Sequence, residues 1–229
     1  MNNLTRDIDS LMCAFKSMGS ELSFEKICEY DDEQKKEYKE LLDIFKTTNS
    51  SDSSSDEKGI ALENIASFLL KTGNIFKVYR NIKTSTNELD QFAKCNNNTN
   101  ILFNIGIIDC RLKDFIGECK NYNSKVGVTH IGKIYSLLST TGLKLCILFS
   151  YHGVTGTDWK DGMGLIKKIY MTKEKPEEKY CIIDFNINDF ENVNNDGNFL
   201  QIIHDKIEAL RLDTDYSELI SKHEAENQI

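Results

Sequence analysis

Three carboxylates and one lysine in the middle of the chain have the types and the order that metal-dependent phosphodiester chemistry requires. Glu63 comes first, Asp90 follows, and Glu118 and Lys120 flank Cys119. Carboxylates are the hard oxygen ligands that Mg²⁺ prefers, and a bound ion lowers the pKa of water. A lysine can offset the charge that develops on the phosphate. These residue types therefore make Asp90, Glu118 and Lys120 candidates for a site around a Mg²⁺ ion, for which Mn²⁺ can substitute, with Glu63 as a further carboxylate ahead of them.

The spacing of these residues also predicts where their side chains point. Residues two apart on a strand share one face of the sheet, so Glu118 and Lys120 should project together while Cys119 points into the opposite side. If the strand of Asp90 lies beside that of Glu118, both carboxylates converge on one cation. Glu88 shares the face of Asp90 and is an extra ligand or a rival for its role. Cys119 has no evident histidine partner, which favours a packed core residue over a nucleophile.

Each of these residues has a simpler explanation when it is taken alone. Glu63 can be a solvated acid on an amphipathic helix, and Asp90 can end a strand. Glu118 and Lys120 can be an ion pair on a solvated sheet face. The nuclease interpretation depends on the ordered combination.

The elements that must position these residues follow from apolar periodicity and turn-prone breaks. Periodic apolar residues predict helices, and short runs rich in branched or aromatic residues predict strands. The sequence predicts helices over 59–73, 126–138 and 199–212, and strands over 75–79, 87–93, 101–108, 115–120, 144–150 and 180–185. The first four strands are interpreted as a meander, and the order of elements predicts a mixed α/β domain.

Composition shifts divide the chain into four expected regions. Apolar residues spaced three and four apart over 24–45 predict amphipathic helices, so residues 1–46 form a small helical N-terminal region. The Ser/Asp-rich stretch 47–58 has no apolar residue to bury and predicts a flexible linker. Residues 59–190 form the expected core, and residues 191–229 an acidic helical extension.

At the candidate residues the chain resembles the PD-(D/E)xK nuclease superfamily, and within it the Mrr-like type IV restriction endonucleases. The resemblance rests on Glu63 in the leading helix, the acidic stretch 87–90, the tripeptide 118–120 and the helix–strand pair ending at 145–150. It implies an α/β restriction-endonuclease-like core, a mixed sheet flanked by helices, over 59–190. It also implies catalytic Glu63, Asp90, Glu118 and Lys120, with the three carboxylates as metal ligands. It further implies a DNA endonuclease activity and a role in restricting foreign DNA. Leu89 departs from the proline in the superfamily pattern.

Charge is strongly segregated along the chain, although its overall net charge is −8. Residues 59–173 carry 15 basic and 8 acidic side chains, whereas the segments before and after are acidic. A basic segment suits binding of a polyanion such as DNA, but chance clustering of solvated surface charge is the simpler explanation of the charge pattern alone. The candidate DNA-binding residues, which alternate with Tyr122, Tyr135 and Trp159, are Lys125, Lys133, Lys160, Lys167 and Lys168.

Other patterns exclude several classes of protein. The chain has no apolar run of the roughly 18 residues that a membrane helix needs, and residues 1–10 lack an apolar signal core. We therefore expect a cytoplasmic protein without membrane partners. Seven irregularly spaced cysteines argue against a disulfide framework. His152 lies in the glycine-containing stretch 150–156. We interpret this stretch as a plain loop in the first place, and as a loop that contacts a phosphate in the second.

The sequence leaves two further functions open. One is a catalytically inactive nuclease-fold module that binds nucleic acid or a partner protein, and the other is a purely structural protein. No separate DNA-reading domain is evident, so specificity is expected from a homodimer, a partner subunit or the N-terminal helices.

Overall fold

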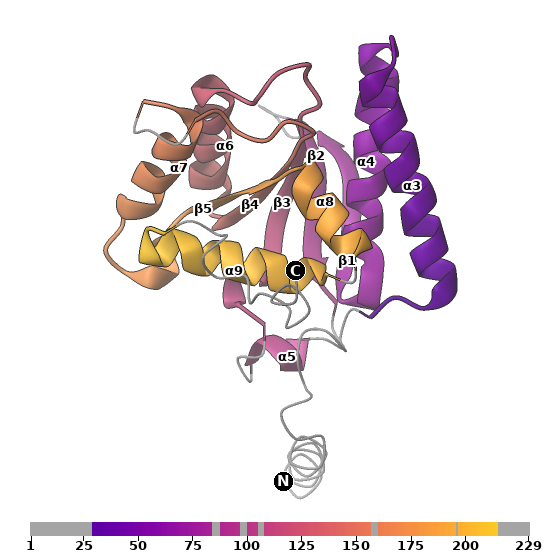
Figure 1. The fold of residues 1–229 in the computed structure, drawn as a ribbon. Coiled ribbons are helices and arrows are strands. Elements are labelled where there is room, and N and C mark those ends of the chain that lie inside the picture. The colour runs from indigo at the N-terminus through magenta and orange to yellow at the C-terminus, as the bar shows by residue number, and fades with distance from the viewer. Residues whose placement is uncertain are drawn as a thin grey trace, which may run out of the picture.

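The protein is a layered α/β structure with a mixed sheet at its centre (Figure 1). The structure, a computed structural model, describes residues 29–83, 88–96, 100–104, 108–156, 160–195 and 197–214. The five strands follow one another across the sheet in chain order. They are β1 (Phe76–Lys83), β2 (Glu88–Cys95), β3 (Asp114–Cys119), β4 (Leu145–Phe149) and β5 (Cys181–Phe185). The α/β class predicted from the sequence is confirmed.

The sheet changes direction at β3. β1, β2 and β3 pair in antiparallel fashion, whereas β3, β4 and β5 run parallel. Parallel neighbours need a crossover, and helices supply both of them. The chain passes from β3 through α6 (Val128–Thr141) to β4, and from β4 through α7 (Gly162–Met171) to β5. The strands predicted over 75–79, 87–93, 115–120, 144–150 and 180–185 correspond to β1 to β5.

Helices cover both faces of the sheet. The helices on one face are α4 (Ser55–Lys71), α8 (Ile187–Asn194) and α9 (Phe199–Leu212), with α3 (Asp32–Ser50) packed outside α4 and α8. Phe149 of β4 lies against aromatic rings of α8 and α9, and α4 approaches the same face at Gly117 through Leu70. α6 covers the other face, and α7 packs beside it. The helix predicted over 199–212 is confirmed.

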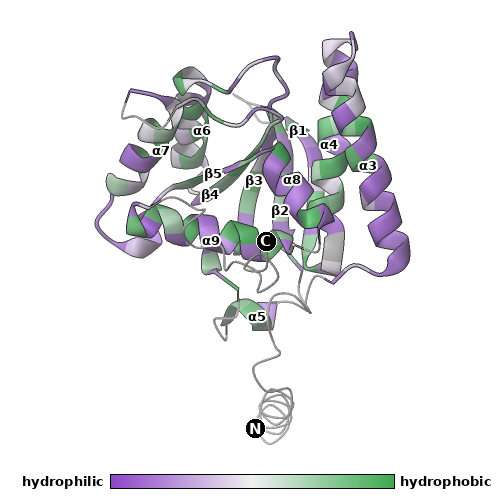
Figure 2. Ribbon diagram, in the orientation of Figure 1, coloured by the Kyte–Doolittle hydropathy of each residue, from purple (hydrophilic) through white to green (hydrophobic). Residues whose placement is uncertain are grey.

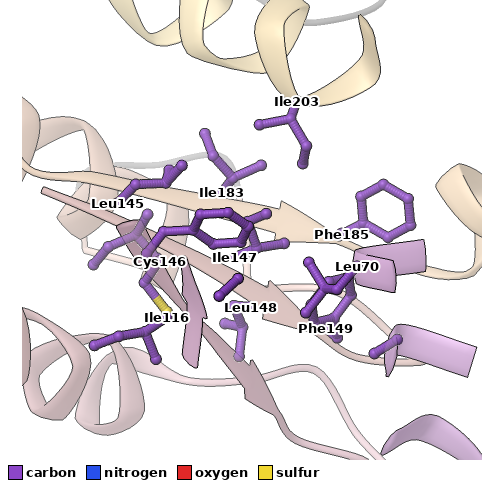
Figure 3. Packing of buried hydrophobic residues seen from close by; sticks show 14 of the residues in the cluster. Leu70, Ile116, Leu145, Cys146, Ile147, Leu148, Phe149, Ile183, Phe185 and Ile203 are labelled. Carbon is purple, nitrogen blue, oxygen red and sulfur yellow. The ribbon is translucent and has the colours of Figure 1, made fainter. Parts of the chain in front are cut away.

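The core is continuous from the sheet into both helical layers. All five residues of β4 are buried, as a central parallel strand requires. Ile203 of α9 points toward Ile183 of β5 (Figure 3), and the strands at the centre are hydrophobic whereas the outer side of α3 is hydrophilic (Figure 2). α3 is tied to this core by the Tyr38 hydroxyl, which donates a buried hydrogen bond of 2.8 Å to the main-chain oxygen of Phe190.

The Ser/Asp-rich stretch 47–58 is not a linker over its whole length. α3 continues to Ser50 and α4 begins at Ser55, so the break is much shorter than predicted. The reason is a capping box: the Ser54 hydroxyl accepts from the Glu57 amide at 3.2 Å, and the Glu57 carboxylate accepts from the Ser54 amide at 2.8 Å. A polar composition therefore conceals a helix start, because Ser and Glu three apart satisfy the first free amides.

The strand predicted over 101–108 is wrong where the structure describes it. Residues Asn100–Asn104 form the short helix α5, and Ile108 lies outside the strands. β3 already has β2 and β4 as neighbours, so the sheet offers no place for another strand there. Phe103 and Ile108 are buried instead beside the sheet. The periodicity of so short an apolar run does not distinguish a strand from a buried helical segment.

None of the helices within the described ranges combines the length and the apolar composition needed to cross a bilayer.

Candidate functional site

The pairing of β2 with β3 brings Asp90 next to Glu118. Gln91 pairs with Gly117 in this antiparallel register, so the residue before Gln91 faces the residue after Gly117. Side chains alternate along both strands, and Asp90 and Glu118 therefore share the sheet face that α6 covers. Lys120 directly follows β3 and its amide donates to the Phe149 carbonyl at 2.9 Å, which continues the parallel pairing with β4.

The Lys120 ammonium joins the two carboxylates. Its Nζ lies 2.7 Å from Glu118 Oε1 and 3.3 Å from Asp90 Oδ2. Asp90 Oδ2 also accepts a hydrogen bond of 2.8 Å from the Cys119 amide, which fixes the carboxylate against the end of β3. Glu118 Oε2 is buried and has no hydrogen-bond partner among the described residues. One carboxylate oxygen at the centre of the site is thus left for a further positive group.

The environment of the site shifts the pKa values of two of its groups. Burial raises the pKa of Glu118, the Asp90 carboxylate adds to this, and the Lys120 ammonium opposes it without cancelling it. Burial lowers the pKa of Lys120, but the charges and hydrogen bonds of Glu118 and Asp90 outweigh burial and leave it above its ordinary value. Lys120 is therefore a charged hydrogen-bond donor at neutral pH, whereas Glu118 is a carboxylate whose ionised form needs a cation.

The opposite sheet face carries Cys119 and Gln91, as alternation predicts. Gln91 Nε2 donates to the Glu63 main-chain oxygen at 3.2 Å and to Ser67 Oγ at 3.1 Å, and so ties β2 to α4. Burial, reinforced by the neighbouring carboxylates, raises the pKa of the Cys119 thiol well above its ordinary value. A thiol held in its neutral form is a poor nucleophile, which supports the assignment of Cys119 as a packing residue.

The fourth predicted residue, Glu63, does not join the other three. Its Oε2 accepts a hydrogen bond of 2.7 Å from Arg80 Nη2 of β1, and its main chain contacts Gln91 on the face opposite Asp90. Within the described ranges, no three His, Cys, Asp or Glu side chains are grouped so as to hold a metal. The predicted Glu63–Asp90–Glu118 ligand set is therefore reduced to Asp90 and Glu118. The side chain of Glu88 lies outside the described residues.

Two asparagines hold the chain after Lys120 in place. Asn121 Nδ2 donates to the Lys58 main-chain oxygen at 2.7 Å, and Lys58 Nζ donates to Asn123 Oδ1 at 2.9 Å. Both contacts reach from this segment to the first turns of α4. The backbone at Lys120 is thus fixed by β4 on one side and by α4 on the other.

The predicted DNA-binding lysines divide into two groups. Lys125 and Lys133 are exposed, and Lys133 lines a pocket that also contains Glu118 and Lys120. Lys160 and Lys168 are exposed near and on α7. Lys167 instead forms an ion pair of 2.8 Å with Asp213 after α9, so its charge is neutralised within the protein. Trp159 lies outside the described residues.

The stretch 150–156 is a loop, as predicted. Gly153 and Gly156 have positive φ values of 73° and 64°, which only glycine adopts freely. The loop is held by backbone bonds: the Val126 amide donates to Gly153 O at 2.8 Å and the Thr155 amide to Val126 O at 2.9 Å. These contacts give the loop a structural role in anchoring the start of α6.

Sequence reasoning singled out Lys133 on α6 as a DNA-binding candidate, but it missed the residues that share the same face of the helix beside the carboxylates. His130, Lys133, Ile134 and Leu137 line a pocket of about 270 Å³ together with Glu118, Lys120 and Tyr122. The spacing of these residues in the sequence was the available signal, because residues three, four and seven apart share one face of a helix. It could not be used without knowing that this face of α6 lies over the carboxyl end of β3.

Comparison of the chain with protein-family models, with curated protein sequences and with solved structures gives no match in any of the three.

Proposed function

We propose that the protein is a metal-dependent endonuclease that hydrolyses DNA phosphodiester bonds. The observation that carries the proposal is the convergence of Asp90, Glu118 and Lys120 on one face, with Glu118 Oε2 buried and unpartnered. The site lies at the carboxyl ends of the parallel strands β3 and β4, where open α/β sheets bind their ligands. A role in restricting foreign DNA follows only from the resemblance of the motif.

The order of elements supports a restriction-endonuclease-like core. The chain runs from α4 through the antiparallel strands β1, β2 and β3, then through α6 to the parallel strand β4. This order agrees with what the motif resemblance implies: a helix acid, a strand acid and the Glu118–Cys119–Lys120 tripeptide before a helix–strand pair. The site residues lie on the second and third strands.

The donor set fits Mg²⁺. This ion is commonly held by one or two protein carboxylates together with waters and phosphate oxygens of the substrate. Asp90 and Glu118 supply two carboxylates, and the raised pKa of Glu118 reflects the need of its ionised form for positive charge. Because Glu63 is paired with Arg80, the proposal assigns it to support of α4 and β1 and not to the metal.

The residues of the chain divide the chemistry among them. Asp90 and Glu118 would hold Mg²⁺, which when bound supplies a Lewis acid and lowers the pKa of water. Lys120 stays protonated, so it donates hydrogen bonds to the phosphate or to the attacking water and offsets negative charge in the transition state. The main-chain hydrogen bond of Lys120 and the side-chain hydrogen bond of Asn121 fix the segment that carries this ammonium next to the carboxylates.

The proposal is tested by incubating plasmid DNA and single-stranded circular DNA with the protein in Mg²⁺, in Mn²⁺ and in chelator. Cleavage should occur with either ion, stop in chelator, and be lost in Asp90→Asn and Lys120→Met. Glu191→Gln and Lys175→Met are matched controls, because each removes a charge from an exposed ion pair. Equal cleavage by the wild type and both site variants would refute the proposal.

One observation favours the alternative of an inactive module that binds nucleic acid or a partner protein. The third expected carboxylate, Glu63, is bound to Arg80, and Lys120 is already engaged by both remaining carboxylates. An inactive module would bind DNA without cleaving it in either metal. The same assay therefore separates the two functions.

A further inference from the structure

The pocket beside the candidate site has the wrong composition for a phosphate group alone. Glu118 and Lys120 form the end of the pocket that belongs to the site, and Ile134 and Leu137 of α6 contribute an apolar wall. Both of these apolar residues are largely buried, so the wall is fixed by packing. A phosphate binds to cations and amide groups and gains nothing from an apolar wall. A flat, partly apolar group does.

An exposed aromatic side chain stands at the same pocket. Tyr122 is 42% exposed, and its ring centroid lies 5.1 Å from that of His130 at an interplanar angle of 39°. Aromatic rings beside cationic groups are the usual platform for unpaired bases, and the stacking does not depend on the base. The pocket volume of about 270 Å³ is below the roughly 300 Å³ at which sites for drug-sized ligands begin, which suits one base with its sugar.

The charges around the ring suit a nucleotide. Lys133 places a cation beside the pocket, whereas the charge of Lys120 is shared with the Glu118 and Asp90 carboxylates, which a bound Mg²⁺ would neutralise. Burial lowers the pKa of His130, and the charges of Lys133 and Lys120 lower it further. The neutral imidazole then offers one donor and one acceptor, as the edge of a base requires.

We propose that this pocket binds one unpaired nucleobase of the substrate, stacked on Tyr122, next to the phosphate that is cleaved. The proposal rests on the nuclease function and narrows its substrate class. A base inside a duplex cannot enter a pocket of this kind without leaving the stack. The preferred substrate is therefore single-stranded DNA, or DNA with an unpaired nucleotide at the cleavage position.

The test measures binding in chelator, so that it does not depend on cleavage. A single-stranded oligonucleotide of about 12 nucleotides with one 2-aminopurine is titrated with the full chain, and the quenching of its fluorescence reports stacking. A duplex of the same sequence is the second probe. Tyr122→Leu should weaken single-strand binding by about 5- to 100-fold and leave duplex binding within about twofold.

Two further variants separate stacking from charge and from misfolding. Tyr122→Phe keeps the ring and should bind the single strand within about twofold of the wild type. Lys133→Met removes a charge and should weaken binding of both probes to a similar degree, because it acts on phosphates. Unchanged single-strand binding by Tyr122→Leu, or equal weakening of both probes, overturns the pocket.

The outcomes for the pocket and for the nuclease function are distinct. If metal-dependent cleavage of single strands and duplexes is the same with and without the Tyr122 side chain, the base-binding pocket is refuted and the nuclease function stands. If single strands bind in a way that depends on Tyr122 but are not cleaved in Mg²⁺ or Mn²⁺, the nuclease function is refuted and the base-binding pocket stands.

Discussion

Replacement of Lys120 by methionine should destabilise the protein in a way that depends on pH and on Mg²⁺. Methionine keeps the length and most of the apolar stem of lysine and removes the ammonium. The Asp90 and Glu118 carboxylates then face each other without the cation that now lies 3.3 Å and 2.7 Å from them. Glu118 Oε2 already has no hydrogen-bond partner among the described residues, so the variant leaves this side chain with little compensation.

The size of the effect follows from how buried the three side chains are. Removing one partner of a fully buried ion pair costs about 3–5 kcal/mol, whereas exposed pairs contribute about 0–1 kcal/mol. The Glu118 side chain is 14% exposed and that of Lys120 is 24% exposed, so water reaches the pair and reduces the cost. We expect the free energy of unfolding to fall by about 1–3 kcal/mol at neutral to alkaline pH.

The deficit should shrink as the pH falls. Burial and Asp90 raise the pKa of Glu118, and Lys120 is a group that lowers it, so the variant raises this pKa further. An acid whose pKa is higher in the folded than in the unfolded state binds more protons when the protein is folded. The folded state therefore gains stability as the pH falls through the folded-state pKa. The difference between wild type and variant should therefore be largest above that pKa.

Urea denaturation at about pH 8 and about pH 5 measures both effects, with and without ~10 mM Mg²⁺. An ion bound between the carboxylates should restore part of the lost stability at the higher pH, because it binds only the folded state. Lys175→Met, at an exposed pair, should change stability by less than about 0.5 kcal/mol. A Lys120→Met deficit that is the same at both pH values and unaffected by Mg²⁺ would refute this account of the site.

Three further changes test separate parts of the structure. Glu63→Gln, at a partly exposed carboxylate paired with an arginine away from the metal, should leave cleavage within about threefold of the wild type, whereas Asp90→Asn should abolish it, as measured by initial rates in Mg²⁺. Tyr38→Phe should lower the free energy of unfolding by about 1–2 kcal/mol in a denaturant titration, because it leaves a buried main-chain oxygen of α8 without its 2.8 Å hydrogen bond. Lys133→Met should reduce the slope of log K against log salt for duplex DNA by about 0.9, whereas Lys167→Met should leave it unchanged, because its ammonium is already paired.

Each of these has an outcome that counts against it. Equal loss in Glu63→Gln and Asp90→Asn would place Glu63 at the metal. A Tyr38→Phe variant as stable as the wild type would mean that α3 contributes little to the core. Equal slopes for both lysine variants would remove Lys133 from the DNA contact.

The central geometry of the site could be predicted because strands obey a simple rule. Alternation alone placed Glu118 and Lys120 on one face and Cys119 on the other, whatever the rest of the fold did. The proximity of Asp90 required one further assumption, that β2 pairs with β3. The predicted meander would have put the segment 101–108 between these two strands, and they pair because Asn100–Asn104 form a helix and leave β2 beside β3.

Other features depend on partners that no local pattern reveals. Glu63 was expected at the metal because its helix precedes the strands, but Arg80 on β1 takes its carboxylate, and a pairing across 17 residues leaves no trace in either segment. The pocket on α6 could not be predicted without knowing how the chain crosses from β3 to β4. The apolar run at 101–108 was assigned to a strand because its composition suits one, although both neighbours of the following strand, β3, are taken by β2 and β4.

The register between β2 and β3 has a consequence for which changes in length the chain can tolerate. A slip of one residue in this register would bring Gln91 to the α6 face and turn Asp90 toward the apolar side of α4. One residue inserted inside β2 would therefore both remove the site and bury the charge of Asp90. Between β2 and β3 the chain leaves the sheet for α5 and a short turn before it returns, and there added residues do not change which side chains face α6. Natural variation in length should therefore accumulate between Cys95 and Asp114, while the distance from Asp90 to the end of its strand stays constant.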